Sequence, residues 1–252
     1  AVDNFLRGDA SALALLPSRL FGDAFDVACA AGHVAVLDHL LEARTASAIQ
    51  RTADSSYPIW AAASYGHAAV VERLLGLEEL VGLKGGGGFS GGGTILGCRG
   101  DTETGSQPLH VAAARGHAKV VKLLLDHGAD PNAPMPAELG GATPLLLACA
   151  EGHTDVVRLL LWGGADPDLA ERSPRAATPL LLAAAAGHAR VVRLLLRGNA
   201  SGNASGNATW NVSAAAAQPA KADANGVTPL AAAAAGGHES TAAMLRNADA
   251  VA

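Results

Sequence analysis

The 252-residue chain is poor in aromatic residues, in net charge and in long apolar runs. Aromatic residues make up 4% of it although 50% of its residues are hydrophobic, so its core must consist mainly of alanine and aliphatic side chains. A formal net charge of −5 gives no reason to expect nucleic acid or an anionic membrane as a partner. No apolar stretch reaches the roughly 18 residues that a membrane span requires, and no basic segment followed by an apolar one begins the chain. We therefore expect neither membrane insertion nor a secretory signal.

The chain has only three cysteines, which cannot all pair with one another. Cys29 and Cys149 occupy the same position of a repeated phrase, three repeats apart, which is too far for a disulfide between them. We expect both to be small core residues in a reducing compartment, most simply the cytoplasm, with the nucleus or a plastid as alternatives. Cys98 lies in a glycine-rich stretch, and a reactive thiol there would need a basic or metal environment that the sequence does not provide.

The dipeptide Gly-His occurs six times, each time within the same longer phrase. Successive copies are 34, 50, 36, 35 and 50 residues apart. A period of about 33 residues accounts for these spacings if the two long gaps each contain roughly 17 inserted residues. A fixed period of this length is typical of a stacked array of short units. The six dipeptides begin at Gly32, Gly66, Gly116, Gly152, Gly187 and Gly237.

The phrase around each Gly-His aligns without gaps. Residues 107–117 read QPLHVAAARGH and residues 143–153 read TPLLLACAEGH, and both are followed by an apolar run and by a turn, GADPN at 128–132 and GADPD at 164–168. This phrase resembles the ankyrin repeat, whose pattern includes Thr-Pro-Leu-His-x-Ala and a period of 33. The resemblance extends from about Leu20 to the end of the chain.

The resemblance implies an all-α repeat solenoid of stacked helix-turn-helix units with β-hairpin-like finger loops. The residues favour the same fold independently. Thr and Pro suit the start of a helix, Gly suits the turn after it, and the Val-Val-x-Leu-Leu-Leu run supplies an apolar face at helical spacing. Lys122, Arg158 and Arg193 then face outward. One unit cannot bury its apolar face alone, so we expect residues 1–252 to form a single domain with a helical cap at 1–19.

Histidine is frequent, but we expect no metal or cofactor site and no catalytic site. Equivalent histidines of a stack lie at least one helix spacing apart, whereas a zinc ion needs its nitrogen ligands about 2 Å away. We expect their rings to bond backbone instead. The glycines at 86–91 match a dinucleotide-binding pattern, but neither the preceding strand nor the following helix is present.

Two insertions interrupt the array, at residues 82–105 and 198–222. The first is dominated by glycine, with Phe89 as its aromatic residue, and cannot recover its ordering entropy without a partner. The second contains four tetrapeptides in register, which begin at Asn199, Asn203, Asn207 and Asn211, and includes Trp210. Each tetrapeptide is a formal glycosylation sequon, although we favour a low-complexity expansion because no secretory signal is visible.

The resemblance also indicates a binding surface, because the fingers and first helices of ankyrin repeats line a concave face. The variable positions before Gly-His hold Tyr65, Arg115 and Glu151, a mixed aromatic and charged row typical of protein interfaces. Ordinary solvated side chains are the alternative. Both insertions precede a first helix, so we expect Phe89 and Trp210 to add contacts on the same edge.

The sequence therefore predicts a non-enzymatic scaffold that binds a protein partner through its concave face and finger loops. The alternative is an accessory or targeting subunit of a larger assembly, such as a ubiquitin ligase, a channel or an organellar complex. We expect the chain to be monomeric on its own or a subunit of such a complex. Nothing in the sequence names the partner.

Overall fold

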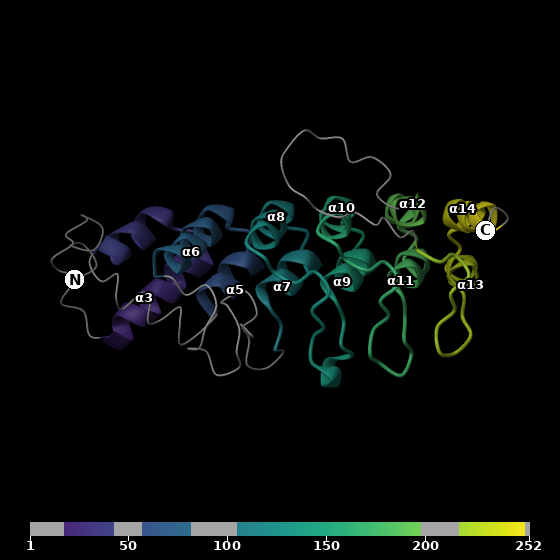
Figure 1. The fold of residues 1–252 in the computed structure, drawn as a ribbon, viewed down its shortest axis with the longest axis horizontal. Helices are drawn as coiled ribbons and strands as arrows, with labels where there is room; N and C mark the ends of the chain where they lie inside the picture. Colours follow the sequence, from purple (N-terminus) through teal and green to yellow (C-terminus); the bar gives the residue numbers. More distant parts are fainter. Residues whose placement is uncertain (1–17, 43–56, 82–104, 198–216, 250–252) are drawn as a thin grey trace.

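In the part of the chain that the structure describes, six helix pairs follow one another along an elongated array (Figure 1). The computed structural model describes residues 18–42, 57–81, 105–197 and 217–249. The first helices of the pairs are α3 (Ser18–Ala31), α5 (Tyr57–Ser64), α7 (Pro108–Ala114), α9 (Pro144–Glu151), α11 (Pro179–Ala185) and α13 (Pro229–Ala235). The second helices are formed by residues 34–42, α6 (Ala68–Val81), α8 (Ala118–Asp126), α10 (Thr154–Trp162), α12 (Ala189–Arg197) and α14 (Glu239–Asp249). The predicted all-α repeat solenoid is confirmed.

Threonine begins the first helix in three repeats, as the sequence predicts. The Thr143 hydroxyl accepts the backbone N–H of Leu146 at 3.3 Å, and Thr178 and Thr228 make the equivalent bond at 3.2 Å. Proline follows each threonine at the first helical position, where a backbone N–H would have no partner inside the helix. Capping and proline together fix where each first helix begins.

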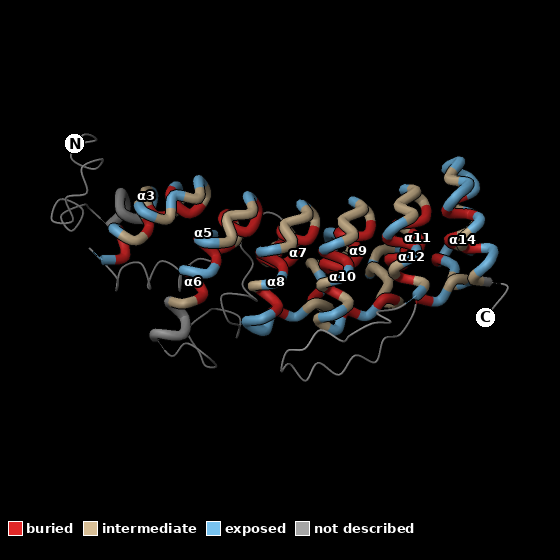
Figure 2. The backbone as a smooth tube through the Cα atoms, turned by 90° about the horizontal axis from the view of Figure 1, so that it is seen from above, coloured by how far each residue is buried: buried red, intermediate tan, exposed pale blue. Residues whose placement is uncertain are grey.

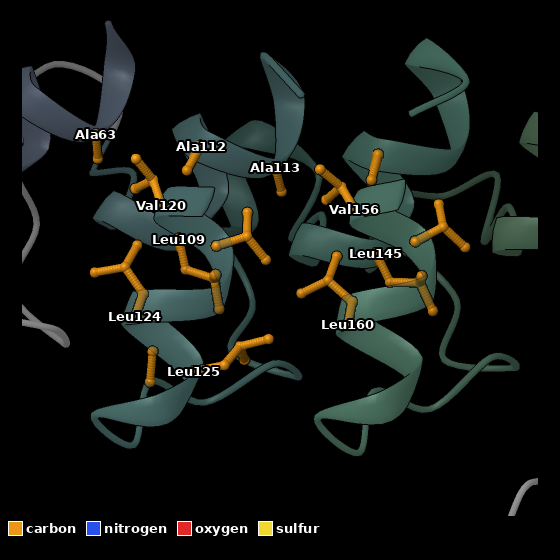
Figure 3. Close-up of a cluster of buried hydrophobic side chains, with 14 of the residues drawn as sticks. Ala63, Leu109, Ala112, Ala113, Val120, Leu124, Leu125, Leu145, Val156 and Leu160 are labelled. Carbon is orange, nitrogen blue, oxygen red and sulfur yellow. The ribbon is translucent and has the colours of Figure 1, made fainter. Parts of the chain in front are cut away.

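Apolar residues at recurring positions of both helices of a pair form the core. Leu109, Leu145 and Leu180 repeat at one buried position, and each is 1% exposed. From α6 to α12 each second helix adds two buried valines and a leucine, among them Val156 and Leu160, which fill the space between adjacent pairs (Figure 3). Buried residues recur in every pair from α3 to α14, so the core is continuous along the array (Figure 2). No described helix is long and apolar enough to cross a bilayer.

In the described residues, finger loops precede the first helices α9, α11 and α13. In Figure 1 the described fingers extend beyond the first helices, away from the second helices. One backbone hydrogen bond spans each finger. The Met135 N–H donates to the Ala142 carbonyl at 2.9 Å. In the other two fingers, Glu171 donates to Ala177 and Asp223 donates to Val227, both at 3.0 Å. These described fingers are hairpin-like but contain no β-strand, and the first carries a short 3₁₀ helix, η1 (Ala137–Leu139).

The second insertion interrupts the array at the end of α12 rather than within a finger. The Ala217 N–H donates to the Leu195 carbonyl at 3.0 Å, the same bond that Ala129 makes to Leu124 and Ala165 makes to Leu160. Residues 217–222, which the sequence analysis assigned to the insertion, therefore form the base of a regular finger, because the closing bond of the helix resumes at Ala217. Most of both insertions lies outside the described residues, as do residues 1–17 of the predicted cap. Ser18 and Arg19 belong to α3.

Candidate interaction surface

Each Gly-His histidine after the first bridges two repeats. The Nε2–H of His153 donates to the Ala114 carbonyl of the preceding repeat at 3.0 Å, and His117 reaches the Ser64 carbonyl at 2.9 Å. His67, His188 and His238 make the same bond, to Ala30, Ala150 and Ala185, at 3.0 to 3.1 Å. The prediction that these rings bond backbone is confirmed. Their role is structural, because each ring holds neighbouring first helices in register.

Within the described residues, no group of three or more His, Cys, Asp or Glu side chains is arranged to hold a metal ion. Cys29 and Cys149 are buried and unpaired, as the sequence predicts. Burial, with a smaller contribution from the Asp26 carboxylate, raises the pKa of the Cys29 thiol to about 12, and burial raises the pKa of Cys149 further. Neither cysteine therefore supplies a thiolate nucleophile at neutral pH. Cys98 lies outside the described residues.

His110 is a second kind of structural histidine. It is 1% exposed, its Nε2–H donates to the Ala133 carbonyl of the finger at 2.9 Å, and its Nδ1 accepts the Gln107 N–H at 3.3 Å. Burial lowers the pKa of His110 to about 4, against smaller opposing effects of the backbone carbonyls and Asp130. The ring is therefore neutral at physiological pH and ties the finger to α7.

Neighbouring fingers are tied to each other through Asn132. Its side-chain N–H donates to the Gly164 carbonyl at 3.1 Å, and its Oδ1 accepts the Asp166 N–H at 2.8 Å. Farther along the array, Arg175 forms an ion pair with the Asp223 carboxylate at 3.3 Å. The same carboxylate accepts two backbone N–H groups of its own finger. These bonds give the described fingers a fixed arrangement relative to one another.

Tyr65 and Arg115 come from consecutive repeats and meet on the exposed side of α5 and α7. The Arg115 guanidinium carbon lies 5.5 Å from the centre of the Tyr65 ring, and one of its N–H groups donates to the Ser64 carbonyl at 3.3 Å. Tyr65 is nonetheless 58% exposed. The pair is an ordered surface feature, because two contacts hold the Arg115 side chain before any partner binds.

The structure connects only two of the five predicted contact residues. Glu151 is exposed at the aligned position of the next repeat, but no ion pair joins it to Arg115 in the described part of the chain. Phe89 and Trp210 lie outside the described residues. That Tyr65, Arg115, Glu151, Phe89 and Trp210 contact a partner stays a prediction.

A row of aliphatic side chains lies on the same face as the Tyr65–Arg115 pair and was not predicted from the sequence. Val111 is one helical turn before Arg115, so the two residues share the exposed face of α7. Leu147 and Leu182 occupy the same position on α9 and α11, and all three are only partly buried. Val27, at that position of α3, is 65% exposed. We call Val27, Tyr65, Val111, Arg115, Leu147, Glu151 and Leu182 the first-helix surface.

A second aromatic pair lies at the N-terminal end of α5. The rings of Tyr57 and Trp60 stack with their centres 6.2 Å apart, and the Trp60 indole N–H donates to the Ser106 hydroxyl at 2.9 Å. Trp60 stands where His110 stands in the next repeat. Its bond to Ser106 therefore provides a different link between repeats at a position where the phrase departs from its consensus.

The comparisons with known proteins agree with this architecture. A family model described as ankyrin repeats in three copies matches residues 25–135, 94–171 and 145–251. Comparison with curated proteins gave no match. The overlapping stretches together cover residues 25–251, from the middle of α3 to beyond the end of α14.

Proposed function

Because the chain belongs to the ankyrin-repeat family, whose members generally mediate protein–protein interactions and are typically not enzymes, we propose that it is a scaffold that binds a protein partner through its first-helix surface. The Tyr65–Arg115 pair is the observation that carries this proposal. Tyrosine and arginine are, with tryptophan, the residue types most enriched among those that dominate interface energies. A pair that is already ordered costs little further entropy on binding.

The aliphatic row supports the same assignment. Val111, Leu147 and Leu182 are partly exposed at the same position of three consecutive repeats, which leaves an apolar strip beside the charged pair. Interfaces commonly have an apolar centre with polar residues at the rim. In this arrangement the strip takes the apolar side chains of the partner, and Arg115 and Glu151 select among partners by charge. Phe89 and Trp210 are proposed to add contacts from the insertions.

The remaining features of the proposal concern assembly and compartment. Two buried, unpaired cysteines favour a reducing intracellular compartment, most simply the cytoplasm. The partner is a protein rather than nucleic acid, because the chain carries a net charge of −5. An accessory role in a larger assembly uses the same surface and differs only in having one permanent partner.

The test is affinity capture with the full chain, followed by mass spectrometry. A variant with Tyr65→Ala and Arg115→Ala should lose the partners of the first-helix surface, with a loss in binding free energy of roughly 2 kcal/mol or more for each purified partner. The matched control is Glu72→Gln, an exposed charge on the opposite side of the array, on α6. One stoichiometric partner indicates an assembly subunit, and several weaker ones indicate an adaptor. Undiminished capture by the double variant contradicts the proposal.

A further inference from the structure

The second helices present a groove that the first-helix surface does not use. The groove lies between α8 and α10, has a volume of about 230 Å³ and is lined mainly by apolar atoms. Leu125, Leu159 and Trp162 form its apolar walls, and Lys122, Asp126 and Asp130 line its rim. Trp162 is 39% exposed, and on α8, α10, α12 and α14 it is the only exposed large apolar side chain among the residues whose burial is described.

Glycine at position 163 keeps this groove open. A Cβ at Gly163 would lie 3.1 Å and 3.2 Å from the two methyl carbons of Leu125, so a side chain here would force the leucine to move. The aligned position at the end of α8 is His127, whose ring bonds back to the Leu123 carbonyl at 2.8 Å. The preceding repeat therefore has a side chain where this repeat has glycine.

A row of positive charges crosses the helices beside the groove. Lys122, Arg158 and Arg193 hold one aligned position on α8, α10 and α12, and all three are exposed. Adjacent members are separated by about one helix spacing of 8–10 Å. Arg158 pairs with Asp155 on its own helix, whereas no carboxylate pairs with Lys122 or Arg193 in the described residues. In a chain of net charge −5, these helices form a local basic surface.

The charges on the three helices are strongly unequal. Six of their exposed side chains are basic and two are acidic. The acidic residue Asp126 lies at the C-terminal end of α8, where it lines the groove with Asp130, whereas Lys122 lies one turn earlier. An acidic ligand is therefore repelled at one end of the groove and attracted at the other. The basic side chains are Lys119, Lys122, Arg158, Arg190, Arg193 and Arg197.

From this arrangement we propose that the groove binds an acidic segment of a partner protein that carries one large apolar side chain. The apolar side chain enters the groove against Trp162, Leu125 and Leu159. The carboxylates that accompany it lie over Lys122, Arg158 and Arg193, because Asp126 and Asp130 exclude them from the other end. This surface is separate from the first-helix surface, so the chain can hold two partners on opposite sides.

Two observations favour a protein segment over other polyanions. A phosphate backbone makes no use of an apolar groove, and its affinity depends on many unpaired cations, of which this row offers few. A lipid surface requires several exposed apolar side chains, and α8, α10 and α12, which form this basic surface, expose only Trp162 among their large apolar residues. A peptide with one apolar anchor and several carboxylates matches both parts of the surface.

The experiment uses the full chain and three fluorescein-labelled synthetic peptides. One carries a phenylalanine among glutamates, one carries the phenylalanine among glutamines, and one carries an alanine among glutamates. Fluorescence anisotropy should give saturable binding of the first peptide and at least about tenfold weaker binding of the other two. Binding of the first should weaken with added salt, since the charges are exposed.

The variants separate the two parts of the site. Lys122→Gln with Arg193→Gln should weaken the first peptide at least about tenfold, a change of about 1.4 kcal/mol, and Trp162→Ala should weaken it similarly. Two controls should bind it as the unaltered chain does: Glu72→Gln at the aligned position of α6, and Tyr65→Ala with Arg115→Ala on the first-helix surface. The melting temperature of each variant checks that it is folded.

Three results would overturn the proposal: no saturable binding of the first peptide, equal binding of the glutamate and glutamine peptides, or full binding by the Lys122 and Arg193 variant. Tighter binding of duplex DNA or of phosphatidylserine vesicles than of the first peptide would also overturn it, in favour of a different polyanion. These outcomes are independent of the capture experiment, because that experiment alters residues of the other surface.

Discussion

His153 fills the space that the missing side chain of Gly116 leaves open. A Cβ at Gly116 would lie 2.6 Å from the His153 Nδ1 and 2.7 Å from its Cε1, while the Nε2 of the same ring bonds the Ala114 carbonyl at 3.0 Å. Gly116 also has a φ of +76°, a conformation that side chains disfavour. Gly32, Gly66, Gly152 and Gly187 are related in the same way to the histidine of the next repeat, so each of these glycines both turns the chain and makes room for that ring.

We expect Gly116→Ala to destabilise the array more than backbone strain alone explains. Left-handed backbone costs an alanine about 1–2 kcal/mol, and the collision with the His153 ring adds about 1–3 kcal/mol. Adding His153→Ala removes the collision, so the double variant should recover part of the loss. Chemical denaturation of the four proteins of this cycle measures the coupling.

Gly237 is the matched control for that cycle. It has a φ of +72°, but a Cβ there would meet nothing within 4 Å, because no described histidine packs on it. Gly237→Ala should therefore cost only the backbone strain. Purely additive effects of Gly116→Ala and His153→Ala would show that the ring and the glycine do not compete for the same space.

Thr241 is the buried polar group that the described structure leaves unsatisfied. It is 0% exposed, and its hydroxyl has no hydrogen-bond partner. The aligned positions of other repeats hold Val120, Val156 and Val191, each at most 1% exposed. Thr241→Val should stabilise α14 by about 1 kcal/mol or more, since an unsatisfied buried hydroxyl costs about 1–3 kcal/mol. Slower amide hydrogen exchange in α14 is the measurement.

The reverse change provides the control. Val156→Thr places a hydroxyl at the equivalent position of α10 and should destabilise that repeat by a similar amount. If both substitutions leave exchange unchanged, the hydroxyl of Thr241 is satisfied in solution and the site is not strained.

The repeat architecture could be predicted from the sequence because its determinants are local. Thr143, Pro144 and Gly152 set the limits of α9 by capping, fixed φ and left-handed backbone, which act within a few residues. The burial of Leu160 followed from helical spacing in the same way. The position of Tyr65 and Arg115 on the surface followed from the alignment of repeats.

The remaining features depend on contacts between repeats, which no local pattern encodes. The stacking of Arg115 on Tyr65 requires side-chain rotamers from two repeats to agree, and the groove beside Trp162 depends on how Leu125 packs against Gly163. The end of the second insertion was misplaced for a related reason. Alanines occupy residues 214–217, and only the bond from Ala217 to Leu195 marks where the array resumes.

Leu160 tests whether the array unfolds locally. Its side chain is 0% exposed at the centre of α10, so Leu160→Ala should cost about 2–5 kcal/mol. In a linear stack each repeat contacts only its neighbours, so hydrogen exchange should accelerate first in α9 and α10 and in the adjoining helices. Uniform loss of protection from α3 to α14 would contradict a linear array.

His110 makes the stability of the third repeat depend on pH. Burial lowers the pKa of this ring from 6.5 to about 4, so between these values the unfolded chain binds a proton that the folded chain does not. Its stabilising contribution is complete above pH 6.5 and is lost as the pH falls toward 4, by about 3 kcal/mol in total.

His110→Gln retains an N–H donor for the Ala133 carbonyl but cannot be protonated. Denaturation midpoints across this range should therefore fall less steeply with acid in the variant than in the unaltered chain. The Gly-His histidines are the same in both proteins, so they contribute equally and cancel from the difference. Parallel pH profiles would mean that His110 is protonated in the folded chain as readily as in the unfolded one, and that its bond to the finger does not require the neutral ring.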